Sequence, residues 1–305
     1  ERGDPTKYSE QPAFRGEGFR YDSFEQFESI LIDHALDWFD SPDSYHEAAK
    51  LIFSKQVEQN VKYVETSFHA GMMEFLKIPG EEILKAILSA VPSQLEARVF
   101  LGISRNAYTP YLGPLLEEAI EKWDSLAGID LHGLESLPME AWTQPFWKRA
   151  SACGKTLKAH AGEFGPAANV EQAVVELGVR RIQHGVRSSE SEKTMKLLLE
   201  EGVTLDLCPI SNYKLRVVDE YEDHPIGGFM KRGIRCTVST DDPLSFNNSL
   251  NQEYEVLIEK MGFSAREIGR LAWNGFEVSD LDADRAASFQ SQIDELVDET
   301  CPADE

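Results

Sequence analysis

Strand-like and helix-like segments alternate along residues 61–243, and this alternation restricts the fold more than any other feature of the sequence. The strand-like segments are short and rich in apolar residues, and most are followed by a stretch with apolar residues at helical spacing. Such alternation is typical of parallel βαβ units with right-handed crossovers. Seven strands are expected, over 61–68, 96–104, 127–133, 155–162, 180–185, 203–209 and 234–243.

A closed barrel is the expected arrangement of these strands. An open arc of seven strands would leave two unpaired edges, whereas eight strands close. An open doubly wound sheet is the alternative, but no GxGxxG motif follows any of the strands. We therefore predict a (β/α)8 TIM-type barrel whose first strand lies upstream of Glu1, because residues 1–21 contain no strand-like run.

The chain is predicted to form a single domain, 1–305, because its length suits one large barrel. Helical patterns at 23–39 and 44–59 predict lid helices in the segment 1–60. Barrel strands two to eight follow at 61–243. The segment 244–305 holds C-terminal helices, expected over 249–261, 264–276 and 281–298.

The formal net charge of −23 restricts the classes of partner. Nucleic-acid binding needs a basic face, so no nucleic-acid partner is expected, and no membrane partner either. No apolar run approaches the ~20 residues of a membrane span. The four cysteines contain no CxxC pair, which predicts a reduced, cytoplasmic protein. The sequence begins without Met, so we expect a processed, trimmed or incomplete N-terminus.

Reactive side chains collect at the expected C-terminal ends of the strands, which form the active face of such barrels. Three of the seven histidines fall there. The remaining four, at 34, 46, 69 and 224, are expected in packing or loop roles. This clustering of histidines at strand ends is the signal that points to a site there. Glu65 either points into the barrel mouth or pairs with a cation of a neighbouring strand. The residues at the strand ends are Glu65, Ser104, His132, His160, His184, Cys208, Asp241 and Asp242.

Each main candidate also has a purely structural interpretation. His160 and Glu163 suit a zinc ligand and an acid–base group, or a buried histidine followed by a surface glutamate. His184 can instead hydrogen bond to a neighbouring loop. Asp241 and Asp242 can simply begin a turn or cap a helix. The residues taken singly leave these alternatives open.

The combination of motifs resembles one family. KAHAGE (158–163), IQHG (182–185) and STDDP (239–243) occur in this order at the ends of strands five, six and eight. Together they resemble the adenosine/adenine deaminase family of the metal-dependent amidohydrolase superfamily, over about residues 22–280. GIDLHGLE (128–135) and CPISNYKL (208–215) resemble that family's strand-four and strand-seven segments.

The resemblance implies hydrolytic deamination of a 6-aminopurine by a zinc-activated water. It implies His160 and Asp241 as zinc ligands and Glu163 as the proton donor to purine N1. It implies that His184 orients and deprotonates the attacking water. The chemistry suits these roles, because a metal lowers the pKa of bound water to about 7 and attack on the ring needs protonation at N1.

The resemblance also implies groups that contact the purine, which is the expected small-molecule partner. Asp242 is implied as the partner of N7 and the backbone N–H of Gly133 as the partner of N3. His132 stands where the family usually has a small residue. We assign His132 to substrate contact, with replacement of a missing zinc ligand as the alternative.

The resembled family carries a His-x-His pair at the end of strand one that supplies two zinc ligands. No such pair occurs in the 305 residues. Two further ligands for one zinc ion per chain are therefore expected upstream of Glu1, because catalytic zinc generally has three protein ligands. The alternative is a metal-free, inactive purine-binding relative. We favour the enzyme, because Glu163, His184, Asp241 and Asp242 are all present together.

The substrate is less restricted by the sequence. An adenosine-type nucleoside or a related adenine compound is expected, with adenine or aminodeoxyfutalosine as the alternatives. A metal-dependent hydrolase of amides or phosphoesters is disfavoured, because no candidate carboxylated lysine or second-metal cluster is found.

Overall fold

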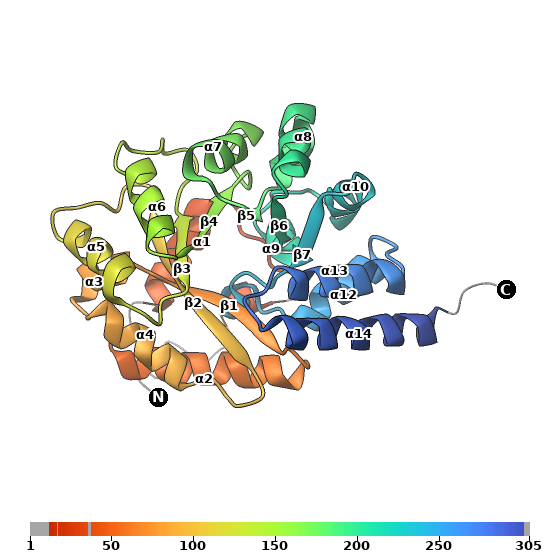
Figure 1. Ribbon diagram of the computed structural model, residues 1–305, viewed down its shortest axis with the longest axis horizontal. Helices are drawn as coiled ribbons and strands as arrows, with labels where there is room; N and C mark the ends of the chain where they lie inside the picture. The colour runs from red at the N-terminus through yellow and green to blue at the C-terminus, as the bar shows by residue number, and fades with distance from the viewer. Residues whose placement is uncertain (1–11, 17, 36–37, 302–305) are drawn as a thin grey trace.

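The computed structural model describes residues 12–16, 18–35 and 38–301. Seven parallel strands form one sheet in which each strand pairs with the next along the chain. Figure 1 shows this sheet curling into part of a barrel with helices around its outer side, which confirms the predicted TIM-type fold. The strands are β1 (Tyr63–His69), β2 (Glu96–Ser104), β3 (Gly128–His132), β4 (Thr156–Ala161), β5 (Arg181–His184), β6 (Thr204–Leu207) and β7 (Arg235–Val238).

Helices connect the strands and continue beyond the last one. Short helices α3, α9 and α11 occupy places where the sequence predicts only loop or strand. The helices are η1 (Ala13–Arg15), α1 (Phe24–Ala35), α2 (Pro42–Glu58), α3 (Gly71–Leu76), α4 (Gly80–Ser89), α5 (Leu112–Lys122), α6 (Thr143–Ala152), α7 (Ala167–Leu177), η2 (Val186–Glu190), α8 (Glu192–Glu200), α9 (Pro209–Lys214), η3 (Tyr221–Asp223), α10 (Ile226–Lys231), α11 (Pro243–Phe246), α12 (Leu250–Glu259), α13 (Ala265–Glu277) and α14 (Ala283–Thr300).

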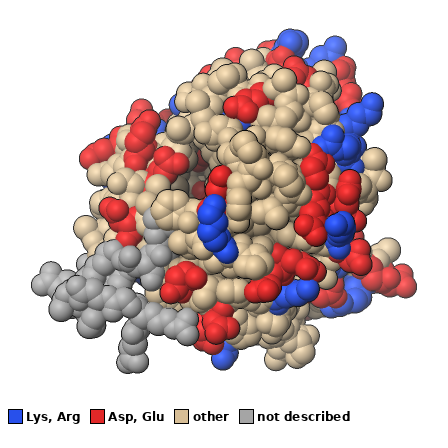
Figure 2. Space-filling model, turned by 90° about the vertical axis from the view of Figure 1, so that its left-hand side faces the viewer, with Lys and Arg blue, Asp and Glu red and all other residues tan. Residues whose placement is uncertain are grey.

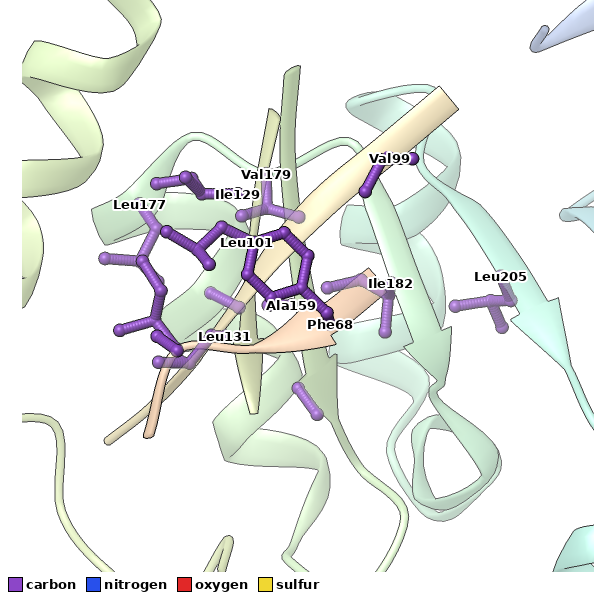
Figure 3. Packing of buried hydrophobic residues seen from close by; sticks show 14 of the residues in the cluster. Phe68, Val99, Leu101, Ile129, Leu131, Ala159, Leu177, Val179, Ile182 and Leu205 are labelled. Carbon is purple, nitrogen blue, oxygen red and sulfur yellow. The ribbon is translucent and has the colours of Figure 1, made fainter. Parts of the chain in front are cut away.

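The two faces of the sheet differ in chemistry because successive side chains point to opposite faces. Leu101, Ile129, Ala159 and Ile182 come from four neighbouring strands, and each is buried. Figure 3 shows these side chains packed together in one apolar cluster. Burying a Leu or Ile side chain contributes about 1.5–3 kcal/mol, so this layer is a main source of stability.

The opposite face, which lines the barrel interior, carries a buried network of charges. Lys158 forms an ion pair with Glu65. Arg181 lies 2.9 Å from Asp206 and 3.3 Å from Glu65. Thr237 donates a 2.5 Å hydrogen bond to Asp206. Glu65 on β1 therefore pairs with cations of β4 and β5, which are not its neighbours in the sheet, and it is not free at the barrel mouth.

The last strand ends earlier than predicted. The sequence predicts a strand over 234–243, whereas β7 ends at Val238. Asp241 has a positive φ of 56°, which an extended strand does not allow. The side chain of Asp242 accepts hydrogen bonds from the backbone N–H groups of Leu244 and Ser245 and so begins α11. The helix-capping interpretation of this pair is therefore correct for Asp242.

The two outermost strands of the sheet, β1 and β7, do not pair with each other. Among the described residues β1 pairs only with β2, and β7 pairs only with β6. Side chains of α13 and α14 line the cavity on this side of the sheet. The extra strand that the sequence analysis expects upstream of Glu1 falls outside the described residues and stays a prediction.

Segments before β1 pack against the mouth of the barrel. Tyr21 is fully buried and makes edge contacts with Phe27 and Phe246. Phe24 contacts Phe164, which directly follows Glu163. These contacts lie where the lid segment 1–60 is expected; the division of the single domain into three segments stays a prediction.

The surface agrees with the acidic composition. Figure 2 shows one face of the molecule, with acidic side chains scattered over it and no continuous basic patch on its described part. No helix among the described residues is long and apolar enough to span a membrane.

Candidate active site

The C-terminal ends of the parallel strands surround one large cavity of about 2680 Å³. Every candidate that the sequence analysis placed at a strand end lines it. Parallel strands bring residues far apart in the chain to one rim, which is why motifs from β3 to β7 meet here. The predicted site residues that line the cavity are His132, Gly133, His160, Glu163, His184, Asp241 and Asp242.

His160 is held in place by Asp130, which motif analysis did not single out. Nδ1 of His160 lies 3.2 Å from Oδ1 of Asp130. Burial raises the pKa of the Asp130 carboxyl, but His160 and His132 outweigh this effect and lower it. Burial lowers the pKa of His160, yet Asp130 and Asp241 raise it overall. Asp130 precedes His132 by two residues, so strand periodicity alone places both on the cavity face.

His132 packs closely beside His160. Their ring centroids lie 4.3 Å apart, and Nε2 of His132 lies 3.4 Å from Oδ2 of Asp130. The ring fits only because position 102 is glycine. A Cβ atom on Gly102 would lie 2.4 Å from Cε1 of His132.

Glu163 lies in a tight loop after β4 that a second glutamate holds. Glu135 accepts hydrogen bonds from the backbone N–H groups of four consecutive residues, Gly162 to Gly165. The Asn169 side chain adds a further donor at 3.2 Å. Glu135 is 7 % exposed, and it lies only three residues beyond His132 in the chain.

The buried environment of Glu163 favours its protonated form. Burial raises its pKa well above the ordinary value, and the negative charges of Asp241 and Glu135 raise it further. A protonated carboxyl beside a substrate cavity can act as a general acid. The alternative of a surface glutamate is therefore wrong, since Glu163 is 7 % exposed.

His184 is buried as a neutral ring. Burial is the main cause that lowers its pKa to about 4. Nδ1 lies 3.2 Å from the side-chain nitrogen of Asn212 and 3.5 Å from Oε1 of Glu163. The residue has a positive φ of 65°, an unusual conformation that tends to occur at functional sites.

Asp241 and Asp242 have different surroundings. Ser211 donates a 2.6 Å hydrogen bond to Oδ2 of Asp241. Asp242 accepts from Ser245 Oγ at 2.5 Å in addition to its helix-capping bonds. Burial raises the pKa of Asp242, although the bonds from Ser245 and Leu244 oppose this.

The side chains fit a metal ion of the zinc type. Two groups of potential ligands occur among the described residues, and in each the ligand atoms lie within 4.8 Å of one another. Nitrogen, oxygen and sulfur donors of this kind suit zinc. Because Asp130 binds Nδ1 of His160, the other ring nitrogen is left for a metal. The groups are Asp130, His132 and His160, and His184, Cys208 and Asp241.

Other histidines differ in their relation to the site. His69 ends β1, lies 2.7 Å from Ser104 Oγ and lines the cavity. His224, expected in a loop, is buried and lies 3.1 Å from Asn212 Oδ1. Asn212 and His224 are thus further members of the site that motif analysis did not assign.

Comparison with known proteins agrees with this geometry. The model of the adenosine deaminase family matches residues 10–296. The chain belongs to the adenosine deaminase family. The family match covers every motif of the site, from GIDLHGLE to STDDP.

Several proteins with known names or structures are similar to this chain over most of their length. An adenine deaminase from Bordetella parapertussis is 30% identical over 267 residues, covering 85% of this chain and 83% of that protein. The adenine deaminase structure from Arthrobacter aurescens has a TM-score of 0.85 at 23% identity, covering 91% and 86%. An amidohydrolase from Burkhoderia ambifaria, solved with bound Zn, has a TM-score of 0.78 at 24% identity, covering 88% and 78%.

Proposed function

We propose that this protein hydrolytically deaminates a 6-aminopurine and releases ammonia. The observation that carries the proposal is the buried Glu163, whose raised pKa keeps a proton available beside His184 in the cavity. Replacement of an aromatic amino group needs a proton delivered to the ring as the water adds. A carboxyl group kept protonated by burial supplies that proton near neutral pH.

Each site residue has one role in this reaction. Glu163 gives its proton to N1 of the purine. His184 orients the water at the carbon that bears the amino group and takes the proton that this water loses. Asp242 and the backbone N–H of Gly133 contact N7 and N3. His132 borders the same cavity and contacts the bound purine.

His160 and Asp241 would hold a zinc ion, one per chain. A bound zinc ion supplies Lewis acidity that makes a water molecule nucleophilic at neutral pH. Asp130 orients the ring of His160 toward that role, and Ser211 orients Asp241. His160 belongs to one of the two groups of potential ligands and Asp241 to the other.

Adenine and adenosine-type nucleosides are the competing substrates. The curated relatives are named adenine deaminases, which favours the free base at least as much as the nucleoside. Aminodeoxyfutalosine remains an alternative of the same chemical class. A small-molecule aminopurine is the only partner that the proposal requires.

Ammonia release from adenine and from adenosine, with and without added zinc, tests the proposal. Glu163→Gln should lower kcat by about 10²–10⁴-fold, because glutamine cannot deliver a proton. Glu255→Gln, at an exposed position on α12, is the matched control. Unchanged turnover in Glu163→Gln would contradict the proposal, and purine binding without ammonia release would support the metal-free alternative.

A further inference from the structure

A chain of buried hydrogen bonds lies behind the candidate site. It joins His224, Asn212, His184 and Glu163, which come from four different parts of the fold. All four residues are at most 7 % exposed. The proposed reaction uses His184 and Glu163 but gives no role to Asn212 and His224.

The chain of hydrogen bonds begins at the backbone N–H of Ile226, which can act only as a donor. The N–H of Ile226 donates to Nδ1 of His224 at 3.3 Å. A backbone N–H can only donate, so Nδ1 carries no hydrogen. Burial is the main cause that lowers the pKa of His224 to about 3, so the ring is neutral. Its single N–H hydrogen is therefore on Nε2.

This hydrogen decides the orientation of the Asn212 amide. Nε2 of His224 lies 3.1 Å from Oδ1 of Asn212, and the N–H donates to that oxygen. The reversed amide would set an NH₂ group against an N–H group, with no acceptor between them. The NH₂ group of Asn212 is therefore directed to the other side, 3.3 Å from Glu163 Oε1 and 3.2 Å from His184 Nδ1.

Both atoms that receive the NH₂ group must be acceptors. Nδ1 of His184 therefore carries no hydrogen, and the neutral ring holds it on Nε2. Oε1 of Glu163 likewise accepts, so a protonated Glu163 carries its hydrogen on Oε2. We propose that His224 and Asn212 are positioning residues that fix the hydrogen positions of His184 and Glu163.

The chemical meaning of this arrangement rests on the proposed function. Glu163 holds its acidic hydrogen on the oxygen that Asn212 does not contact, where it is available to the purine. His184 offers an N–H at Nε2, which donates a hydrogen bond to a water oxygen. In this resting state Nε2 orients water but has no lone pair, so His184 can take the proton of the water only after its own Nε2 hydrogen has left.

Nitrogen NMR of the histidine rings tests the proposal directly. Protonated and unprotonated ring nitrogens resonate in separate regions, so the spectrum of a ¹⁵N-histidine sample assigns each hydrogen. We expect an unprotonated Nδ1 and a protonated Nε2 in both His184 and His224. A protonated Nδ1 in either ring would overturn the proposal, and this test of the wild-type chain needs no variant.

Two substitutions test the donor-to-acceptor direction of these hydrogen bonds. Asn212→Asp keeps the shape but removes the NH₂ group, so the hydrogen of His184 should move to Nδ1 while His224 is unchanged. His224→Gln keeps a donor toward Oδ1 of Asn212, so the His184 pattern should remain. A His184 pattern that does not respond to Asn212→Asp contradicts the proposal.

Kinetics supply a second measurement. Asn212→Asp should lower kcat on the order of 10²-fold with a small change in KM, because Asn212 acts through the acid and not on the substrate. Gln94→Glu adds the same charge at an exposed site before β2 and should leave both constants unchanged. Wild-type kcat in Asn212→Asp would overturn the positioning role. If the NMR pattern is as expected but the protein releases no ammonia from adenine or adenosine, only the proposed function is contradicted.

Discussion

Oε1 of Glu135 lies 2.6 Å from the backbone nitrogen of Gly162, and Oε2 accepts from the next three backbone N–H groups. Burial raises the pKa of Glu135, but these hydrogen bonds outweigh it and lower the pKa. Glu135 therefore stays ionised, and its charge raises the pKa of Glu163. The Glu135 carboxylate thus fixes the backbone of the loop that carries Glu163, and its charge favours the protonated form of Glu163.

Glu135→Gln should destabilise the protein by about 1–3 kcal/mol, because an NH₂ group would replace one acceptor and leave buried N–H groups unpaired. The midpoint of urea unfolding measures this loss. Glu255→Gln is the exposed control and should change stability by less than about 0.5 kcal/mol. Equal midpoints for the two variants would contradict the role given to Glu135.

Gly102→Ala should force the ring of His132 out of its place, since the new Cβ would lie 2.4 Å from Cε1. Overpacking of this kind costs about 1–3 kcal/mol. The double variant Gly102→Ala/His132→Ala should recover part of the loss, because the ring is then absent. Gly228→Ala on α10 is the control, since nothing lies within 4 Å of its added Cβ. Thermal unfolding of the four proteins checks this prediction.

Arg181→Met should leave Asp206 without its main cation in the barrel interior. Removing one partner of a buried ion pair costs about 3–5 kcal/mol, because the other charge remains buried. Arg232 pairs with Glu192 at the surface, where Arg232→Met should cost at most about 1 kcal/mol. Similar losses in urea unfolding for both variants would show that the interior network carries little stability.

Stability should fall as the pH drops below about 6.5, because His224 resists protonation in the folded state. Its pKa is lowered to about 3 in the fold from 6.5 in the unfolded chain, so below pH 6.5 only the unfolded state gains this proton. One such proton contributes a slope of about 1.4 kcal/mol per pH unit. His224→Gln should remove this contribution between pH 6.5 and 5. An unchanged slope in urea unfolding across that range would mean that His224 titrates normally.

Much of the fold could be predicted from local patterns. Apolar residues at a period of two or 3.6 favour strands and helices through contacts between near neighbours, and their alternation is typical of a parallel sheet. Periodicity does not fix the boundaries of an element, as at Asp241 and Asp242, where a positive φ and a helix cap end the strand early. The Asp-Asp-Pro sequence allows both outcomes.

The site could be predicted only in part. His160, Glu163 and His184 stand in recognisable motifs at strand ends, and the structure brings them to one cavity. Asp130 and Glu135 lie in a segment that the resemblance already covered, yet no spacing rule indicated their hydrogen bonds. Such bonds depend on the relative positions of β3 and the loop after β4, about 30 residues apart in the chain.

The sequence by itself determined the succession of strands and helices, the family and the residues at the strand ends. Only the tertiary structure decided which groups hold those residues and in which hydrogen-bonding state. The reason is physical: periodicity acts between near neighbours, whereas a hydrogen bond requires two distant backbones to bring a donor within about 3 Å of an acceptor. His224 and Asn212 acquire their relation to Glu163 only when α9, the loop after β4 and the segment before α10 come together.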